Sequence, residues 1–371
     1  MKPIVLMWEN LGPMHADRCS AVASQFKGKR RVIVIELGGR SNTYQWERIE
    51  SDRFERVTLF PDKAFSEVNP LYRTWAFIHA CMKIGPAYFF FCHYEYASSF
   101  LVAILLRILR RRVFIMNDSK FDDKPRRIYR EMLKKITLAP YNGAMAGSKR
   151  SAAYLRFLGF SRRPVVLGYD TLSTDRIRTQ AHTGQSQTLI PFASRHFTVI
   201  ARLVEKKNLF TTVDAYFLYV QKIKSARQLH ICGSGPLEHR LKEKVVQLGL
   251  ENFVIFHGQT KSESISRILL QTLAMILVSN EEQFGLVIAE AQAMHVPVIF
   301  SANCGARDEL LRTGVNGYMV EADNPKGIAY FMQRLSERET EWEDMIANSR
   351  SFAAMADATR FGKACEELIL A

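Results

Sequence analysis

Short apolar runs alternate with helical patterns along the first half of the chain. This alternation is typical of βαβ units that build a parallel sheet. Helical patterns lie near residues 14–27, 70–83, 97–110, 125–136 and 149–158. The runs that we interpret as strands are Ile4–Met7, Arg31–Glu36, Arg56–Phe60, Tyr88–Cys92, Val113–Met116, Ala144–Gly147 and Val165–Leu167.

A second alternating series follows a polar segment at residues 171–188, which is rich in Thr, Ser and Gln and which we interpret as a linker. Its predicted strands are Phe197–Ala201, Gln228–Cys232, Val254–Phe256, Ala274–Val278, Val296–Phe300 and Tyr318–Val320. The sequence therefore predicts two doubly wound α/β domains, at residues 1–170 and 189–350. Such sheets bind ligands beyond the carboxyl ends of their strands.

Composition fits a soluble globular protein of about two domains, with 371 residues, 47% hydrophobic and 24% charged. The longest apolar run, Phe100 to Leu106, is far shorter than the roughly 20 residues of a membrane span. The N-terminus is interpreted as a first strand and not as a signal peptide. Six cysteines without a CxxC pair favour free thiols in a reducing cytoplasm.

The net charge of +14 is concentrated in the first half of the chain. Residues 1–170 hold 29 Lys and Arg against 15 Asp and Glu, whereas residues 171–371 hold 22 of each. One interpretation of this charge is that the first domain binds an anionic partner.

The most informative stretch is Ser279–Ala291, where a predicted buried strand, Leu273 to Val278, runs into a polar turn that opens a helix. A helix start offers free N–H groups and the positive end of the helix dipole to a phosphate. Gly285 allows close backbone approach because it lacks a Cβ. Glu282 and Glu290 can accept hydrogen bonds from hydroxyl groups on either side. Phosphate flanked by hydroxyl-bearing rings describes a nucleotide-sugar.

Glu282-Gln-Phe-Gly-Leu-Val-Ile-Ala-Glu290 resembles the E-x7-E signature of retaining glycosyltransferases of family 4. The resemblance implies the GT-B fold, in which two Rossmann-like domains face each other across a cleft. It also implies that Glu282 acts in catalysis, and that Phe284, Gly285, Leu286 and Glu290 bind the donor. Gln283 replaces a glycine that the family usually has.

Further segments extend the resemblance over about residues 197–322. Ala201-Arg-Leu-Val-Glu-Lys-Lys207-Asn is similar to the family's Gly-Arg-Leu-x-x-x-Lys-Gly, which implies that Arg202 and Lys207 neutralise the departing diphosphate. Ala201 and Asn208 replace glycines. The turns at Gly233, Gly235 and Gly258 match the donor-binding region. No residues have metal-ligand spacing, Asp122-Asp123 being a poor substitute for Asp-x-Asp, so we expect neither a metal nor another cofactor.

The first domain resembles the family more loosely. Gly12 follows the first strand where the family often has two glycines, which implies donor contact, and His93 lies where the family often places a histidine facing the transferred sugar. The candidates for an acceptor pocket, each with an alternative structural role, are His15, Asp17, Arg18 and Asp118. The resemblance also implies that the final helical segment, residues 351–371, returns to the first domain.

The leading hypothesis is a metal-independent, retaining hexosyltransferase that moves a sugar from a UDP- or GDP-sugar to an acceptor hydroxyl. The leaving phosphate would help to deprotonate that hydroxyl. A sugar-nucleotide epimerase is a second hypothesis, although Arg202, Lys207, Glu282 and Glu290 argue against it. A nucleic-acid binder is the third, because of the charge, but no RNA- or DNA-binding motif is present.

The basic first domain suggests where the acceptor lies. Arg107, Arg110, Arg111 and Arg112 end one predicted helix, and the next has a basic face opposite an apolar stripe. We expect the stripe (Ile128, Tyr129, Met132, Leu133 and Ile136) to be core, and the basic face (Arg126, Arg127, Arg130, Lys134 and Lys135) to meet the outside. Basic residues bind anionic bilayers. The sequence therefore predicts a peripheral membrane enzyme that glycosylates a lipid-linked glycan acceptor at the cytoplasmic face, with a soluble acceptor as the alternative.

Overall fold

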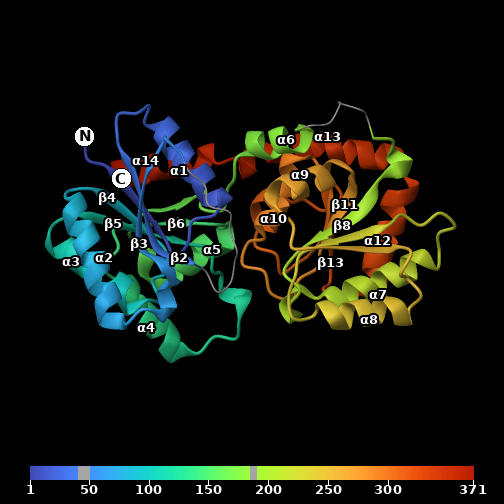
Figure 1. Ribbon diagram of the computed structural model, residues 1–371, viewed down its shortest axis with the longest axis horizontal. Coiled ribbons are helices and arrows are strands. Elements are labelled where there is room, and N and C mark those ends of the chain that lie inside the picture. The colour runs from blue at the N-terminus through green and yellow to red at the C-terminus, as the bar shows by residue number, and fades with distance from the viewer. Residues whose placement is uncertain (41–50, 184–189) are drawn as a thin grey trace. The chain divides into compact units, whose positions relative to one another are not determined.

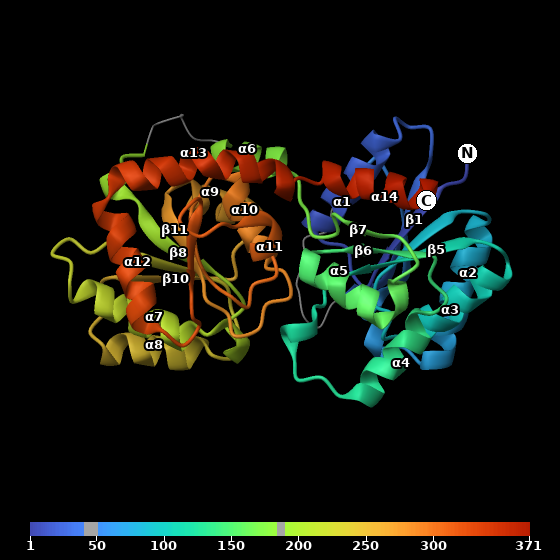
Figure 2. The same cartoon turned by 180° about the vertical axis from the view of Figure 1, so that it is seen from behind.

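The computed structural model describes residues 1–40, 51–183 and 190–371. It divides into two compact units: unit 1 comprises Met1–Ser173 and Ala358–Ala371, and unit 2 comprises Thr174–Asp357. Each unit holds a parallel β-sheet with helices on both of its faces (Figures 1 and 2). The predicted fold class, two doubly wound Rossmann-like α/β domains, is confirmed.

The described part of unit 1 forms a seven-stranded sheet in the order β3-β2-β1-β4-β5-β6-β7. Each strand overlaps a run predicted from the sequence, because buried parallel strands are nearly continuous apolar runs. The bounds are β1 Ile4–Trp8, β2 Val32–Arg40, β3 Glu55–Ala64, β4 Tyr88–Phe91, β5 Arg112–Asn117, β6 Gly143–Ala146 and β7 Val165–Leu167.

Two apolar clusters cover the two faces of this sheet. Val5 and Met7 belong to one cluster and Ile4 and Leu6 to the other, as the alternation of side chains along a strand requires. The first face carries α2 Pro70–Ile84, α3 Ala97–Ile108, α4 Ile128–Leu138 and α5 Lys149–Leu155, with the short helices η1 Phe65–Glu67, η2 Phe121–Asp123 and η3 Arg156–Phe160. The second face carries α1 Pro13–Gln25 and α14 Thr359–Leu370.

In unit 2, the residues that the structure describes form a six-stranded sheet in the order β10-β9-β8-β11-β12-β13. Its strands are β8 His196–Ile200, β9 Leu229–Cys232, β10 Val254–Gly258, β11 Thr272–Leu277, β12 Val298–Ser301 and β13 Gly317–Val320. Its helices are α6 Thr174–His182, α7 Leu209–Val220, α8 Glu238–Gln247, α9 Ser262–Leu270, α10 Leu286–Ala293, α11 Arg307–Leu310, α12 Pro325–Glu337 and α13 Glu339–Ala356, with the short helices η4 Phe192–Ser194 and η5 Glu205–Lys207.

The prediction of a linker at residues 171–188 differs from what the structure shows for its described part. Residues 174–182 form α6, which belongs to unit 2 and packs against α9. Two apolar side chains one turn apart, Ile177 and Ala181, are buried, and they suffice to fix a helix that is otherwise polar. Residues 184–188 and the predicted domain start at residue 189 lie outside the described residues.

The final segment crosses between the two units at a later point than predicted. Residues 351–356 still belong to α13 of unit 2, and the return to unit 1 begins at Ala358. From there α14 packs along α1, where Gly362 lies against the backbone of Ala21. The helix that rejoins unit 1 is therefore α14 alone.

On and just before α4, Arg127, Arg130 and Lys135 of the predicted basic face are exposed as expected, and Arg126 and Lys134 are half-buried. The prediction of a buried apolar stripe on this helix is wrong. Its apolar stripe is exposed, and Glu131 is the side chain that faces inward. Glu131 accepts hydrogen bonds from the Tyr154 hydroxyl and, at 2.9 Å, from Lys134 Nζ. A helical pattern shows that one face is apolar and the other polar, but it does not show which face is buried. Here the partner of the polar face, Tyr154, lies elsewhere in the chain, so the pattern of the helix alone could not reveal it.

All six cysteines are buried and unpaired, as predicted. Among the described residues, no helix is both long enough and apolar enough to span a bilayer.

Candidate functional site

Unit 2 gathers its predicted site residues at the point where its strand order reverses. β8 lies between β9 and β11, so the loops that follow these three strands meet at one edge of the sheet. Arg202 and Lys207 follow β8, Gly233 and Gly235 follow β9, and Glu282 follows β11. Ligands of open α/β sheets bind at such a switch point.

The loop between β11 and α10 is held in one conformation by glycines. Gly285 is the N-cap of α10 and has φ 95°, a left-handed conformation that side chains disfavour. Gly305, from the loop after β12, lies so close to the Gln283 carbonyl that a Cβ there would collide with it. The Gly305 and Ala306 amides donate to the Glu282 and Phe284 carbonyls at 3.2 and 2.9 Å. The start of α10 is therefore preorganised.

Glu282 and Lys207, both predicted as catalytic residues, form an ion pair. Both side chains are 11% exposed, so the pair lies just beneath the surface. Ser279 Oγ donates to the same carboxylate oxygen of Glu282 at 3.3 Å. A cation and a carboxylate in contact can bind adjacent groups of one ligand, the cation a phosphate and the carboxylate a hydroxyl.

Asn208, which replaces a glycine of the family pattern, explains how the loop after β8 is fixed. It adopts the left-handed conformation with φ 56°, which Asn tolerates better than other side chains. Its Nδ2 donates to the carbonyls of Val278 at 3.0 Å and Ala322 at 2.6 Å. The Asn280 amide donates to the Lys206 carbonyl at 2.9 Å. These bonds tie the loop that carries Lys207 to the loop that carries Glu282.

The glycines after β9 permit close packing against the loop after β8. A Cβ at Gly233 would collide with the Ala201 carbonyl, and one at Gly235 would collide with Leu203. The Gly233 amide donates at 2.7 Å to the carbonyl of Gly258, at the end of β10. The three glycines predicted from the resemblance are therefore adjacent, and they bring backbone amides to the switch point.

The remaining predicted donor residues of unit 2 differ in exposure. Arg202 is half-buried directly after β8, and Leu286 is half-buried at the start of α10. Phe284 and Glu290 are each only 4% exposed, with Glu290 in the second turn of α10. Burial and the charge of Glu282 raise the pKa of the Cys304 thiol to about 12, so this neighbouring cysteine is not a thiolate at neutral pH.

Unit 1 repeats this arrangement at its own switch point, between β1 and β4. Gly12 is the N-cap of α1, and its amide donates to His15 Nδ1 at 3.0 Å. Burial, with smaller contributions from the charges of Arg18 and His93, holds the pKa of His15 well below its ordinary value. His15 is therefore neutral and caps the helix start.

His93 follows β4 and has φ 58°. Its Nδ1 lies 3.1 Å from Glu95 Oε1, and its ring stacks on Tyr96. Burial lowers the pKa of His93, but the hydrogen bond and charge of Glu95 outweigh burial, with Glu9 and Asp118 adding to them, and the net result is a raised pKa. The imidazole is thus favoured in its charged form among carboxylates.

The four acceptor candidates separate into two groups. Asp118, after β5, lies near His93, and His15 is coupled to His93 by charge. Asp17 and Arg18 instead serve the fold: Asp17 accepts from the Ser173 amide at 2.9 Å, and Arg18, 1% exposed, donates to the Thr171 carbonyl at 3.0 Å. We therefore leave Asp17 and Arg18 out of the candidate site.

Glu36, at the end of β2, is a functional candidate that the sequence analysis missed. Its buried carboxylate accepts from the Leu11 amide at 2.9 Å, from Arg56 at 2.7 Å and from Thr58 at 2.7 Å. Glu36 thereby fixes the loop that carries Gly12. The sequence did contain a sign of this role, namely a carboxylate at the end of an otherwise apolar strand. A buried charge needs partners, so such a carboxylate indicates contacts with other segments.

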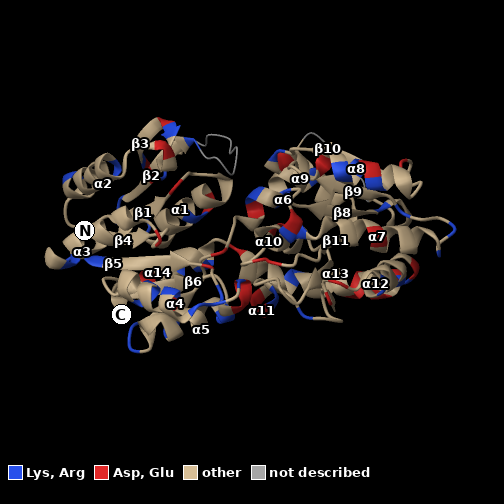
Figure 3. Cartoon of the chain, turned by 90° about the horizontal axis from the view of Figure 1, so that it is seen from below, with Lys and Arg blue, Asp and Glu red and all other residues tan. Residues whose placement is uncertain are grey.

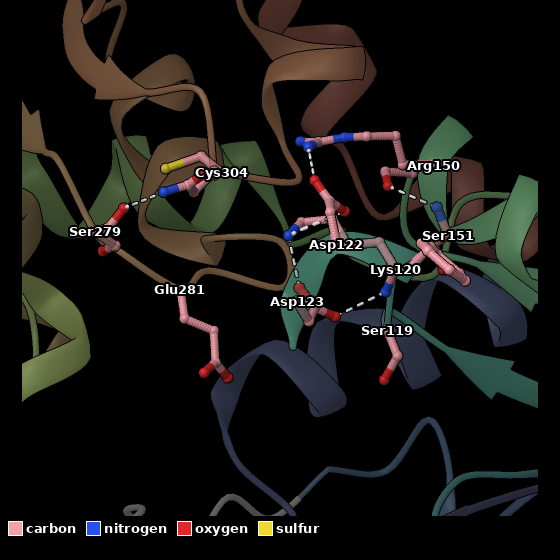
Figure 4. A network of polar contacts seen from close by, with 12 residues as sticks. Ser119, Lys120, Asp122, Asp123, Arg150, Ser151, Ser279, Glu281 and Cys304 are labelled. Atoms are coloured by element: carbon pink, nitrogen blue, oxygen red, sulfur yellow. Dashed lines mark hydrogen bonds and ion pairs between the residues drawn. The ribbon is translucent and has the colours of Figure 1, made fainter. Parts of the chain in front are cut away.

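Asp122 and Asp123 are neutralised by cations of unit 1 (Figure 4). Lys120, 1% exposed, lies 2.6 Å from Asp123, and Arg150 lies 2.6 Å from Asp122. Across residues 1–40, 51–183 and 190–371, no cluster of three or more His, Cys, Asp or Glu has the arrangement of a metal site.

Residues 185–352 match the family model described as "Glycosyl transferases group 1". The match covers the switch point of unit 2 and less than half of the chain. Two relatives align with 108 and 130 residues of the chain. The glycosyltransferase MJ1607 of Methanocaldococcus jannaschii is 32% identical over 29% of this chain and 27% of its own length. The N-acetyl-alpha-D-glucosaminyl L-malate synthase of Bacillus anthracis is 30% identical over 35% of this chain and 33% of its own. The chain thus spans about a third or less of these relatives.

The fold of the whole chain matches solved structures. Alr3699/HepE of Anabaena, crystallised in complex with UDP, superposes with a TM-score of 0.73 over 100% of both chains at 16% identity. At that identity the likeness establishes the fold alone.

Proposed function

We propose that the protein is a glycosyltransferase that takes a sugar from a nucleotide-sugar bound by unit 2. The observation that carries this proposal is the Lys207–Glu282 pair at the switch point of the unit that matches the glycosyltransferase family model. The UDP bound to Alr3699/HepE supports a UDP-sugar as the donor, with a GDP-sugar as the alternative.

In the proposed reaction, Lys207 and Arg202 stabilise the negative charge that develops on the departing diphosphate. The amides at the start of α10 and in the glycine turn after β9 bind the phosphates. Glu282 accepts a hydrogen bond from a hydroxyl of the transferred sugar, and Glu290 serves the ribose. The protein itself supplies the positive charge, so the proposed mechanism requires no divalent metal.

We propose further that transfer retains the anomeric configuration. In the family that the sequence resembles, the leaving phosphate helps to deprotonate the acceptor hydroxyl. In unit 1, Gly12 and His93 are the residues proposed to face the sugar, with His15 and Asp118 beside them.

The proposed acceptor is a lipid-linked glycan, and the proposed location is the cytoplasmic face of an anionic membrane. Support comes from unit 1, which holds 31 Lys and Arg against 17 Asp and Glu, whereas unit 2 holds 20 of each. Because cationic residues are attracted to anionic lipid headgroups, this imbalance favours a membrane-bound acceptor over a soluble one.

Thermal-shift screening against nucleoside diphosphates and nucleotide-sugars tests the proposal directly. We expect stabilisation by one diphosphate and its sugar conjugates, because a ligand that binds only the folded state raises its melting temperature. Hydrolysis of the selected nucleotide-sugar should follow, without epimerisation of the sugar. Epimerised product would favour the epimerase hypothesis, and filter binding of DNA or RNA without any nucleotide response would favour the nucleic-acid hypothesis.

A further inference from the structure

The exposed face of α4 carries large apolar side chains at helical spacing. Ile128 is 74% exposed, Leu133 60% and Ile136 59%, and Tyr129 and Met132 lie on the same face. Single exposed apolar residues are ordinary, but a contiguous group of this size marks an interaction surface. Nothing in unit 1 covers these side chains among the residues that the structure describes.

A buried polar network fixes α4 with this face outward. Lys134 Nζ donates to Glu131 at 2.9 Å and to the Tyr154 hydroxyl at 2.7 Å, and the same hydroxyl donates to Glu131. Glu131 is only 3% exposed. Turning the helix over would break this network and would leave Glu131 and Tyr154 without their partners, so the outward orientation of the stripe is a stable feature of the fold.

The neighbouring helices continue the apolar surface. The helices α2, α3 and α4 lead into the adjacent strands β4, β5 and β6 and lie on the same face of the sheet (Figures 1 and 2). On α2, Leu71 is 83% exposed, and Tyr72 stacks on Trp75 with ring centroids 6.0 Å apart. At the end of α3, Ile108 is 72% exposed. We call the exposed side chains of these three helices the outer face of unit 1.

The charge of the outer face has one sign. In residues 70–84, 97–108 and 128–138, Glu131 is the only acidic residue, and it is buried. Exposed cations flank the apolar side chains: Arg107 at the end of α3, Arg110 just after it, Arg127 just before α4, and Arg130 and Lys135 on α4 itself. Apolar side chains bordered by cations match the chemistry of an anionic lipid surface, in which acyl chains lie beneath anionic headgroups.

We propose that the outer face of unit 1 inserts its apolar side chains into an anionic bilayer, with α4 lying in the plane of the interface. The basic residues contact the headgroups, and the stripe enters the boundary with the acyl chains. This inference deepens the proposed function, on which it rests for the lipid-linked acceptor. It replaces the expectation that the basic face of α4 meets the membrane while its apolar stripe is core.

Vesicle binding without any nucleotide-sugar tests the insertion. We expect the protein to co-sediment with phosphatidylcholine vesicles that contain about 30% phosphatidylglycerol at low salt, and to bind pure phosphatidylcholine far less. Raising salt to about 0.5 M should weaken the binding without abolishing it, because salt screens charges but not apolar insertion. Complete release at that salt would show electrostatic contact alone and would overturn the insertion.

Two sets of exposed substitutions separate the contributions. Ile128→Gln with Leu133→Gln and Ile136→Gln should lower partitioning about tenfold or more, at low and high salt alike, because the apolar area is lost while the charges stay. Arg127→Glu with Arg130→Glu and Lys135→Glu should lower it mainly at low salt. Matched controls on other surfaces are Leu370→Gln on α14 and Val246→Gln on α8, which are 78% and 58% exposed and should bind as wild type does.

A local probe reports insertion itself. Leu133→Trp should shift its emission to the blue and be quenched by brominated lipids, whereas Val246→Trp should show neither effect. Absence of quenching at position 133 would overturn the proposal. A dimer that the apolar triple variant dissolves would overturn it too, because a second copy would then cover the face. Circular dichroism and nucleoside diphosphate affinity should be unchanged in every variant, so failure of insertion is distinguishable from failure of the donor assignment.

Discussion

The two units place functional side chains at equivalent points of their sheets but gather opposite chemistry there. In unit 2, which has no net charge, the loops after β8 and β11 present Arg202 and the Lys207–Glu282 pair. In unit 1, which carries the whole excess of +14, the loops at the switch point gather His93 with Glu9, Glu95 and Asp118. The net charge of a unit therefore does not predict the charge of its site.

Part of the excess positive charge of unit 1 lies on or beside its helices α3 and α4. Figure 3 shows basic segments near the end of α3 and along α4, whereas α8 of unit 2 carries both signs. Cations at a strand end suit a compact diphosphate, and cations spread along helices suit an extended anionic surface. Under the proposed function, the two sets of basic residues would bind two different anions.

The largest expected effect concerns the donor side. Arg202→Ala and Lys207→Ala should each lower turnover by about 10²-fold or more, because each removes electrostatic stabilisation from a charged leaving group. Steady-state transfer or hydrolysis of the nucleotide-sugar measures this loss, while binding of the acceptor alone should change little.

Lys206→Ala is the matched control for these variants. Lys206 neighbours Lys207 in sequence, but its side chain is 35% exposed and lies 4.0 Å from Glu281, so its loss should leave turnover close to that of wild type. Near-normal turnover in both Arg202→Ala and Lys207→Ala would refute the assignment of unit 2 as the donor unit.

The sequence predicts more of unit 2 than of unit 1. Glycines with positive φ at 233, 235, 258 and 285 leave a visible signature, since few other residues fit there. Contacts such as Glu36 with Leu11, or Glu131 with Tyr154, join segments more than twenty residues apart and leave no local pattern. That is why the exposed face of α4 and the role of Glu36 needed the structure.

The two glutamates of unit 2 sharpen the division of roles on the donor side. Glu282→Gln should lower turnover by roughly tenfold or more while weakening the binding of free nucleoside diphosphate less, since its proposed partner is a sugar hydroxyl. Glu290→Gln should weaken diphosphate binding more, since its proposed partner is the ribose. Isothermal titration measures both affinities. Equal losses of affinity in the two variants would contradict the proposed roles.

Histidines extend the comparison to pH, with a smaller effect. In unit 2, His196 and His230 stack with ring centroids 3.7 Å apart. Burial, together with the charge of its neighbour, lowers the pKa of His196 to about 3, and burial, together with the charge of His257, lowers the pKa of His230 to about 4. In unit 1, the pKa of His93 is raised. The contribution of His93 to stability should therefore change with acid in the direction opposite to that of the stacked histidines, whereas His15 of unit 1, whose pKa is also lowered, should follow the stacked pair.

The sign follows from linkage between protonation and folding. A histidine with a lowered folded-state pKa stabilises the fold above its unfolded pKa of about 6.5, and that stabilisation is lost as pH falls below it. His93 behaves oppositely, and loses its contribution as pH rises through its raised pKa. Between pH 7 and pH 5 we expect the free energy of unfolding of unit 2 to fall by about 1 kcal/mol, after discounting for the partial exposure of the two histidines.

Urea titration at both pH values, followed by hydrogen exchange in each unit, measures this difference. His230→Phe keeps the ring stacking without titration and should reduce the loss in unit 2. His239→Gln is the control variant, because the His239 side chain is 86% exposed and lies outside the stacked pair. Equal acid sensitivity of wild type and His230→Phe would show that the stacked histidines are not responsible.

The smallest expected effect is that of metal chelation. It tests whether either unit holds a divalent metal that the reaction needs. A divalent ion needs carboxylates. On the proposed donor side Glu282 is paired with Lys207, and further carboxylates lie around His93 at the switch point of unit 1 and at Asp122 and Asp123. Lys120 and Arg150 already compensate Asp122 and Asp123. We therefore expect transfer activity within about twofold of its starting value in excess EDTA, because the protein supplies the positive charge itself.

An absolute requirement for magnesium or manganese would show that the leaving-group chemistry does not rest on Arg202 and Lys207. Asp118→Asn would then be the first variant to test for loss of metal affinity.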